Sequence, residues 1–397
     1  MRDLVCSAYT GMQDKTKTTA KVGSSKGEPF DFWPHPAVIS ENNFKYKSLS
    51  NWAFNISMGC VHACRFCYVP DASANWQAAE LKNYGVADPD EQWGSYSLLR
   101  PWDEHEFLKS LRKADGTLIS ELKPDGNRAV MLCTTTDPYQ TFMASTPEKT
   151  QLLNASAQAL VRKALEAIRD HSTLNVRILT RSPLAKRDFD LFKSFGNRLV
   201  FGMSLPTLDN KLSKIYEPKA PAPTQRLATL KAAQAAGLHV FVAVAPTYPE
   251  CDEADLRATL TAIKELDPIT IYHEPINIRS ENVARIKEHA KELGVTVNTA
   301  VFQTPETWRR YAVESLQLVQ RVATDLGLLG HLHLWPDKTL GSESLFLKLR
   351  KQQWENAPLT RFQRKLAKAE DKRYYDENYK PWIEDWWSRI SEWPGQR

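Results

Sequence analysis

Short apolar runs alternate with segments of helical periodicity from about residue 51 to about residue 335, and this alternation constrains the fold more than any other feature. Each run is bounded by turn or polar residues, as expected for buried strands. The candidate strands are Ala53–Met58, Ala129–Cys133, Val176–Thr180, Leu199–Ser204, Val240–Ala245 and Ile269–His273. Strands that alternate with helices form parallel crossover units, so the sequence predicts an α/β fold with either a barrel or a doubly wound sheet.

The helical segments between these strands have recognisable ends. Thr146 followed by Pro147 is typical of a helix start, because proline fits the first helical turn, where its missing N–H is not needed. Further helices are expected over about 224–237 and 280–294, each of which ends in a glycine. Helices of this length can carry the chain from one parallel strand to the next.

Three other regions set the domain organisation around a barrel that we place at 51–335. Residues 1–50 have no sustained periodicity and predict an extended N-terminal segment. The stretch 70–127 is too long for an ordinary connection and contains a helical run, so we expect a structured insertion. Residues 336–397 are rich in Lys, Arg and aromatic side chains and predict a helical C-terminal extension.

The apolar stretches and the cysteine count indicate the compartment in which the protein resides. The longest apolar stretches, such as 238–246, are far shorter than the roughly 20 residues that span a bilayer, so no membrane span is expected. The first 30 residues carry no apolar core of a secretory signal, and we expect a cytoplasmic protein. Six cysteines in a reducing compartment indicate metal binding or catalysis rather than disulfides.

Three of these cysteines form the most informative motif. Cys60, Cys64 and Cys67 lie within eight residues, close enough to bind three irons of a [4Fe–4S] cluster and to leave the fourth iron open for substrate. A tetrahedral zinc site is the alternative, and His62 is its candidate fourth ligand. A histidine between two ligands of one short loop would have to fold back to complete the tetrahedron, so the iron–sulfur interpretation is favoured.

The Cys-x-x-x-Cys-x-x-Cys spacing, with Phe66 before the last cysteine, resembles the signature of the radical S-adenosylmethionine (SAM) superfamily. Within it, other segments are similar to the spore photoproduct lyase-like group. These segments are Thr135–Gln140, Leu179–Pro183, Ser204–Leu208 and Glu217–Pro221. The resemblance covers roughly 50–280 and departs from the group at 55–58 and 69–70.

The resemblance implies a fold and a chemistry. The fold would be a partial parallel (β/α)6 barrel, and the cofactors would be a [4Fe–4S] cluster on Cys60, Cys64 and Cys67 together with SAM. The cluster would cleave SAM reductively to a 5′-deoxyadenosyl radical that takes hydrogen from an unidentified substrate. Such chemistry needs a reductant such as flavodoxin or ferredoxin.

The resemblance also assigns cofactor contacts at the carboxyl ends of the strands, where barrel enzymes carry their functional groups. The expected cofactor-binding residues are Phe66, Thr135, Thr136, Asp137, Thr180, Arg181, Ser204, Pro246, Asn277 and Arg279. It implies that the second strand end meets the methionine amino group and the fifth strand end meets the adenine with Phe66. It further implies that Arg181 binds the carboxylate and Ser204 the ribose, since an arginine fork suits a carboxylate.

Structural roles are the alternatives for several of these residues. Asp137 could belong to a simple turn, and Ser204 could cap the segment that follows it. Arg181 could be a solvated loop cation. Asn277 and Arg279 could serve the start of the helix expected near residue 280.

Tyr68 and Cys133 are candidate catalytic residues. In spore photoproduct lyases a cysteine and nearby tyrosines relay the hydrogen atom that quenches the product radical, and Tyr68 directly after Cys67 resembles one such tyrosine. Cys133 lies on the second strand, near the face where substrate would sit. A buried core cysteine is the alternative, because free cysteine is among the most buried residue types.

Several functional alternatives remain. Lysines and arginines interleaved with Trp354 and Phe362 could follow a phosphate backbone, but an apolar stripe at helical spacing favours packing, so nucleic acid is possible and not favoured. The net charge of +5 neither requires nor excludes an anionic partner. The first interpretation is a radical SAM enzyme that acts on a small molecule or a peptide. The alternatives are an enzyme that repairs a DNA lesion, an enzyme that transfers a 3-amino-3-carboxypropyl group from SAM, and a non-catalytic metal protein that binds nucleic acid.

Overall fold

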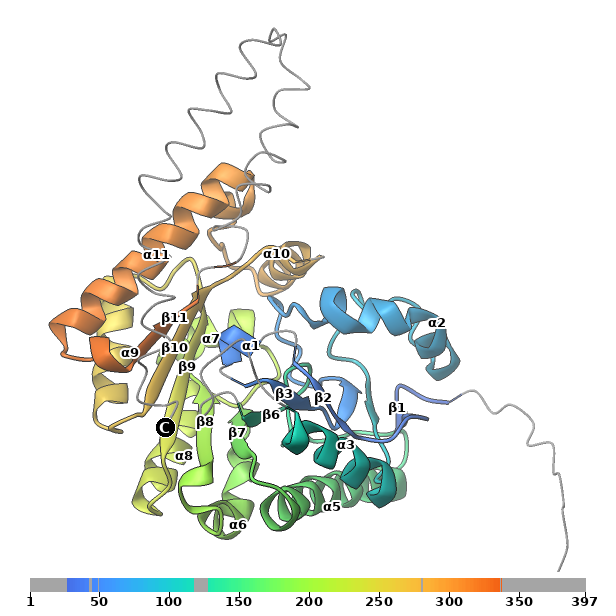
Figure 1. Ribbon diagram of the computed structural model, residues 1–397. Coiled ribbons are helices and arrows are strands. Elements are labelled where there is room, and N and C mark those ends of the chain that lie inside the picture. The colour runs from blue at the N-terminus through green and yellow to red at the C-terminus, as the bar shows by residue number, and fades with distance from the viewer. Residues whose placement is uncertain are drawn as a thin grey trace, which may run out of the picture.

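A computed structural model describes residues 27–42, 45–48, 50–117, 128–279, 281–335 and 337. Its main element is an eight-stranded sheet with the order β11-β10-β9-β8-β7-β6-β3-β2 (Figure 1). The strands are β2 (Ile39–Glu41), β3 (Trp52–Phe54), β6 (Ala129–Leu132), β7 (Asn175–Thr180), β8 (Leu199–Ser204), β9 (Val240–Thr247), β10 (Thr270–Pro275) and β11 (Leu332–Leu334). All neighbours are parallel except β2 and β3.

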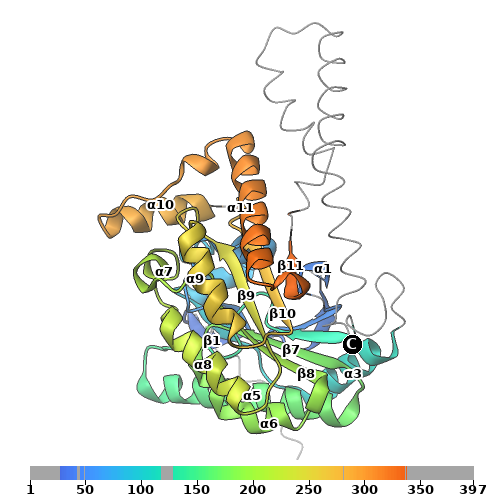
Figure 2. The ribbon, with the colours of Figure 1, turned by 90° about the vertical axis from the view of Figure 1, so that its left-hand side faces the viewer.

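Helices connect the parallel strands and cover the outer side of the sheet. The larger ones are α3 (Glu104–Gly116), α5 (Pro147–His171), α8 (Pro223–Ala235), α9 (Glu253–Lys264), α10 (Asn282–Glu292) and α11 (Pro305–Asp325). The shorter ones are α1 (Lys45–Ser48), α2 (Ala78–Leu81), α6 (Phe189–Lys193) and α7 (Asn210–Tyr216). Figures 1 and 2 both show α5, α6, α8 and α9 along one side of the sheet.

This architecture confirms the partial parallel barrel. The six expected strands are present in chain order as β3, β6, β7, β8, β9 and β10, and the sheet gains β2 at one edge and β11 at the other. The two edge strands do not pair with each other, so the barrel is open. The carboxyl ends of the parallel strands therefore face one common site.

The first expected strand is the exception, because the structure divides it. Ala53–Met58 was expected to be continuous, but β3 ends at Phe54 and a separate strand, β4 (Ser57–Gly59), joins another sheet. Asn55 lies at the break, and its side-chain Oδ1 accepts a hydrogen bond of 2.9 Å from the N–H of Thr135. The chain therefore leaves the main sheet where this side chain binds the loop after β6.

The second sheet contains strands from three parts of the chain. Its order is β1-β5-β4, with β1 at Phe30–Phe32 and β5 at Ser97–Leu99. β5 lies within the stretch 70–127 that we expected to be an insertion, and so do α2 and α3. α3 packs on the main sheet through Phe107, whose ring meets that of Phe54 edge-on at 5.4 Å.

Two apolar layers hold the barrel together. The larger lies between the sheet and the helices, and helix α5 contributes its buried stripe from Leu153 to Ile168. A smaller layer of Met131, Phe241, Ala243 and Tyr272 forms a separate buried cluster on β6, β9 and β10. Gly202 on β8 makes room for this layer, because a side chain there would collide with the ring of Phe241.

Three of the expected regions fall partly outside the described residues, and one of them is the insertion, whose residues 118–127 are not described. The C-terminal extension at 336–397 does so except for Asp337, and so does the first part of the N-terminal segment, up to residue 26. The domain boundaries therefore stay predictions. None of the described helices is both long enough and apolar enough to cross a bilayer.

Candidate cofactor and substrate site

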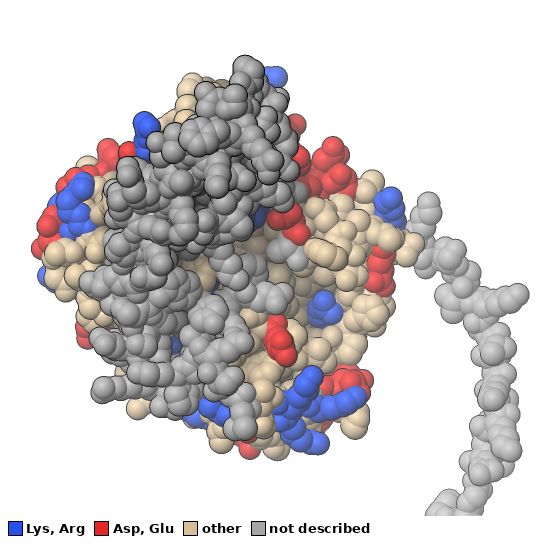
Figure 3. Space-filling model, turned by 45° about the horizontal axis from the view of Figure 1, so that its top comes forward, with Lys and Arg blue, Asp and Glu red and all other residues tan. Residues whose placement is uncertain are grey.

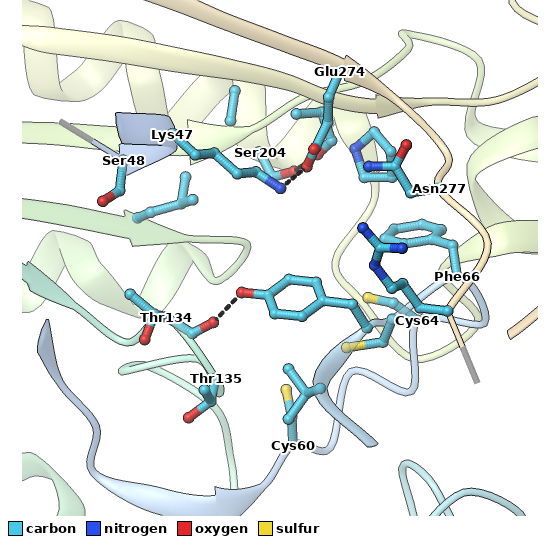
Figure 4. Close-up of a pocket in the computed structure, with 18 of the residues that line it drawn as sticks. Lys47, Ser48, Cys60, Cys64, Phe66, Thr134, Thr135, Ser204, Glu274 and Asn277 are labelled. Carbon is cyan, nitrogen blue, oxygen red and sulfur yellow. Dashed lines mark hydrogen bonds and ion pairs between the residues drawn. The ribbon is translucent and has the colours of Figure 1, made fainter. Parts of the chain in front are cut away.

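A cavity of about 380 Å³ lies at the carboxyl ends of the barrel strands. Every residue that the sequence predicted for the site lines it, except Thr180. Figure 4 shows cysteines 60 and 64 on one side of the cavity and Lys47 and Glu274 on the other. The strand ends thus bring together residues that are more than 200 positions apart in the chain.

The loop that carries the three cysteines is fixed by side chains of α10. Asn282 donates to the carbonyl of Phe66 at 3.2 Å, and Arg285 donates to the carbonyls of Arg65 at 3.3 Å and Cys67 at 2.7 Å. Asn282 and Arg285 stand three positions apart on one helix face, so they reach the same stretch of loop. No local pattern indicates this role, because the partners lie more than 200 residues apart in the chain.

A glutamine from the loop after β6 fixes the start of the cysteine loop. Gln140 accepts a hydrogen bond of 2.9 Å from the N–H of Val61, and its amide nitrogen donates to Ser57 at 2.8 Å. On the other side, Gly94 packs against Ala63. These contacts hold the cysteine loop between two neighbouring segments of backbone.

The three thiols are suitable ligands for an iron–sulfur cluster. All three line the cavity, and Cys64 is buried while Cys60 and Cys67 are partly buried. Burial raises the pKa of each thiol, that of Cys64 to about 12. Metal binding must therefore release protons from these groups, since a thiolate is the ligand. Their donor set fits a cubane with three protein ligands, which spreads its ligands around its corners.

His62 is held by a carboxylate and does not lie among the cysteine side chains as a fourth ligand. Its Nε2 lies 3.1 Å from Oδ2 of Asp137, and both side chains are buried. Among the described residues, no three His, Cys, Asp or Glu side chains are close enough to enclose a single ion. These two observations disfavour the zinc alternative, because a tetrahedral ion needs converging ligands.

Asp137 has a structural function beyond the one we expected. It accepts hydrogen bonds from Thr180 Oγ1 at 2.7 Å and from the N–H of Arg181 at 2.8 Å. Burial alone would raise its pKa, but His62 and these hydrogen bonds lower the pKa of Asp137 to about 2. Thr180 does not line the cavity, and its hydroxyl donates to Asp137, so its contact with the cofactor stays a prediction that the geometry does not favour.

Arg181 is not a free cation in the cavity. Its Nε donates to Oε1 of Glu217 at 2.5 Å, and its guanidinium carbon lies 5.8 Å from the centre of the Phe66 ring. Arg181 lines the cavity, whereas Glu217 does not. These contacts exclude the alternative in which Arg181 is a solvated loop cation. The predicted contact with the carboxylate of SAM would use an arginine that Glu217 already holds in place.

Other predicted residues are partly engaged. Ser204 donates to the carbonyl of Ala245 at 3.0 Å. Arg279 forms an ion pair of 2.5 Å with Asp337, a partner that the sequence did not suggest. By contrast, Oδ1 of Asn277 is buried and has no hydrogen-bond partner among the described residues. An orphaned acceptor of this kind needs a donor from a bound molecule or from water.

The two candidate catalytic residues both line the cavity. Tyr68 donates from its hydroxyl to the carbonyl of Thr134 at 2.5 Å. Cys133 is buried at the end of β6 with a φ of 63°, a left-handed conformation that is unusual for a residue with a side chain. Burial raises the pKa of both groups, so neither is ionised near neutral pH.

The side of the cavity away from the cysteines contains residues that sequence reasoning did not select. Lys47 of α1 forms an ion pair with Glu274 of β10 and lies 5.4 Å from the centre of the Tyr68 ring. Oε2 of Glu274 is buried without a hydrogen-bond partner among the described residues. Ser48, Met131, Tyr272 and Trp335 also line the cavity. Only the position of Glu274 at a strand end could have indicated it.

Solved structures show which fold this chain shares. A variant of spore photoproduct lyase has 12% sequence identity and a TM-score of 0.53, over 77% of this chain and 80% of that one. Another variant, with bound AdoMet and dinucleoside spore photoproduct, has 13% identity and a TM-score of 0.51 over the same shares. At these identities the similarity shows the fold alone.

Sequence relatives and a family model give the family. The uncharacterized protein ORF301 of Acidianus two-tailed virus is 30% identical over 260 residues, which is 64% of this chain and 77% of that protein. The uncharacterized protein MJ0683 of Methanocaldococcus jannaschii is 23% identical over 274 residues, 68% of this chain and 87% of that one. The model of the Radical SAM superfamily, whose enzymes use a [4Fe–4S] cluster and SAM, matches residues 54–263. Since this match spans more than half of the chain and contains the three cysteines, the protein belongs to the radical SAM superfamily.

Proposed function

We propose that Cys60, Cys64 and Cys67 bind the [4Fe–4S] cluster and that the cavity beside them binds SAM and an unidentified substrate. One observation carries this proposal: the three thiols share a single cavity with residues at the carboxyl ends of β6, β7, β8, β9 and β10. No other pair of cysteines stands at such short spacing in the chain. The substrate would lie on the side of Lys47 and Glu274, away from the thiols.

When bound, the cluster and SAM supply one-electron cleavage of a carbon–sulfur bond of SAM and the removal of hydrogen from a substrate. The protein supplies the surroundings. Phe66, Met131 and Tyr272 provide apolar walls that exclude water from a reactive site. The hydrogen bonds of Asn282 and Arg285 to the loop carbonyls keep the thiols in a fixed arrangement.

Polar groups of the strand ends would orient SAM. Asn277 offers a buried acceptor without a partner, which suits an N–H or O–H donor of the cofactor. Arg181 offers a guanidinium held at the cavity wall by Glu217, which suits a carboxylate. Thr135 and Thr136 of the loop after β6, together with Ser204 and Pro246, also line the cavity. We keep the cofactor assignment for these residues as part of the proposal.

Repair of a DNA lesion, as in spore photoproduct lyase, is the second candidate. The observation in its favour is that Tyr68 and Cys133 line one cavity, as a hydrogen relay to a substrate radical requires. Against it, Figure 3 shows Lys and Arg mixed with Asp and Glu on the described part of this face, without a continuous basic surface. A duplex needs such a surface to neutralise its phosphates. Nucleic acid therefore stays an alternative.

The test is anaerobic reconstitution with iron and sulfide, followed by dithionite and SAM and by chromatography of the nucleoside products. Wild type is expected to release 5′-deoxyadenosine, and replacement of Cys60, Cys64 or Cys67 by Ala is expected to abolish both cluster assembly and release. Cys251→Ala is the matched control, because Cys251 is buried outside the cavity. Retained SAM cleavage in any of the three variants would refute the site.

The same assay separates the alternatives. Methylthioadenosine as the product would indicate 3-amino-3-carboxypropyl transfer. Faster formation of 5′-deoxyadenosine with irradiated DNA than with undamaged DNA would favour the repair function. Intact SAM with a bound zinc ion would favour the non-catalytic alternative.

A further inference from the structure

Glu217 is a buried acid whose position beside Cys64 the proposed function does not explain. It follows α7 and begins the segment Glu217–Pro221, and its side chain has 0% exposure. Its Oε1 lies 4.0 Å from Sγ of Cys64, although Glu217 itself does not line the cavity. A carboxylate is therefore buried directly behind one of the three cluster cysteines.

Two arginines from different elements neutralise this carboxylate. Arg181, after β7, contacts its Oε1 at 2.5 Å, and Arg226 of α8 contacts its Oε2 at 2.5 Å. Ser213 adds a hydrogen bond of 3.3 Å to Oε2. Burial alone would raise the pKa of Glu217, but Arg226 and Arg181 lower it to about 2, so the group is ionised.

Arg226 is held in place by backbone carbonyls as well as by Glu217. Its side chain has 0% exposure, and it donates to the carbonyl of Pro221 at 2.7 Å and to that of Ser204 at 3.2 Å. A buried arginine with this many backbone contacts cannot turn away from Glu217 without leaving carbonyls unpaired. The arrangement of the charges is therefore rigid.

The charges balance only when Cys64 is a ligand. Glu217 carries one negative charge and the two arginines carry two positive charges, so the group alone has an excess of one positive charge. A ligating Cys64 is a thiolate and adds the missing negative charge. At 4.0 Å the thiolate and the carboxylate would repel each other, and the arginines offset this repulsion.

We propose that Glu217 is a positioning residue that holds Arg181 at the cavity wall and, with Arg226, sets the reduction potential of the cluster on Cys64. This inference rests on the proposed function, because it assumes that Cys64 binds the cluster. It gives the Glu217–Pro221 segment a purpose that neither its sequence nor its place outside the cavity indicates.

The proposal predicts shifts of opposite sign for two variants. Glu217→Gln removes a negative charge near the cluster, which favours the electron that the cluster gains, so the reduction potential rises. Arg226→Met removes a positive charge, so the potential falls. We expect roughly a tenfold change in the reduced-to-oxidised ratio at a fixed potential, or about 59 mV for one electron.

The double variant separates charge from structural damage. In Glu217→Gln combined with Arg226→Met, Arg181 balances the Cys64 thiolate, so the potential is expected to return to that of wild type. SAM affinity is expected to stay roughly tenfold weaker in Glu217→Gln and in the double variant, because Arg181 has lost the anion that fixes it. If the single variants changed the reduction potential only by damaging the structure, their two changes would instead add up in the double variant.

The experiment is a redox titration of the reconstituted full chain with and without SAM. The titration is monitored by electron paramagnetic resonance of the reduced cluster. Asp188→Asn is the matched control, since Asp188 is also a fully buried carboxylate, pairs with Arg162 at 2.6 Å and does not line the cavity. Its potential is expected to equal that of wild type. Iron and sulfide contents equal to those of wild type establish that each variant has assembled its cluster.

Two results would overturn the inference. One is a set of unchanged potentials in Glu217→Gln and Arg226→Met, each with a full cluster. The other is a shift of the same sign in both. If Glu217→Gln does not assemble a cluster, the sign of the shift in Arg226→Met decides alone. A wild type that binds no cluster would refute the proposed function instead.

Discussion

The contact between Asp137 and His62 makes a quantitative prediction about stability. In the folded protein the pKa of Asp137 falls from its ordinary value of 3.8 to about 2, despite burial that would raise it. This difference in pKa corresponds to about 2 kcal/mol of unfolding free energy, at about 1.4 kcal/mol for each pKa unit. Solvent screening reduces this free energy only slightly, because the Asp137 side chain is only 6% exposed.

Asp137→Asn is therefore expected to lower the unfolding free energy at pH 7 by about 2 kcal/mol. The stabilisation belongs to the ionised group, so it is fully present above about pH 4 and is lost as the pH falls toward 2. The difference between wild type and variant should accordingly be constant from pH 7 down to about pH 5 and shrink below pH 4.

The measurement is urea unfolding of both proteins, monitored by circular dichroism and tryptophan fluorescence. Asp190→Asn is the control, because Asp190 pairs with Arg162 but its side chain is 70% exposed, so the urea midpoint of this variant should barely move. An Asp137→Asn variant that unfolds at the wild-type urea concentration would refute the reasoning, since it would show that these contacts do not stabilise the folded chain.

Three further predictions concern the cysteine loop, the cavity and the core. Gly94→Ala should reduce the iron content after reconstitution, because Gly94 has a φ of 91° and the new Cβ would approach Cα of Ala63 to 2.7 Å. Gly116→Ala, where a Cβ meets nothing within 4 Å, should leave the iron content unchanged. Tyr68→Phe removes the donor to the Thr134 carbonyl and should cost about 1 kcal/mol in urea unfolding; a cost near zero would show that this carbonyl finds water instead. Phe107→Ala deletes a fully buried ring that packs on Phe54 and should cost about 3 to 5 kcal/mol, whereas Leu152→Ala, on the exposed face of α5, should change the midpoint little.

The sequence predicted the parts of the structure that local pattern determines. The five strands after the first were expected within two residues of their ends, because each is an apolar run between turn residues. The three cysteines could be assigned to a cluster because their spacing is local. The first strand was wrong because its break depends on Asn55 binding Thr135, a contact across 80 residues that no local pattern reveals.

The polar site was harder to predict, since the partners of its charges come from distant parts of the chain. Arg181 is recognisable as a strand-end residue, but its carboxylate partner Glu217 lies 36 residues away. The partner of Arg279 lies 58 residues away. Lys47 comes from the segment before the barrel, and nothing in its neighbourhood indicates that it meets Glu274. Such charges can be assigned to cofactor or to protein only when the fold is known.

The unpaired sheet edges have a mechanical consequence. A closed barrel can widen only by breaking the hydrogen-bond ladder between two of its strands. Here α1, which follows the edge strand β2, meets β10 through side chains instead, with the Lys47–Glu274 pair and a hydrogen bond of 3.4 Å from Tyr272 to the carbonyl of Ser48. Among the described residues, such side-chain contacts can break while every ladder of the sheet stays intact. On this side, side-chain contacts rather than backbone pairing therefore set the width of the cavity.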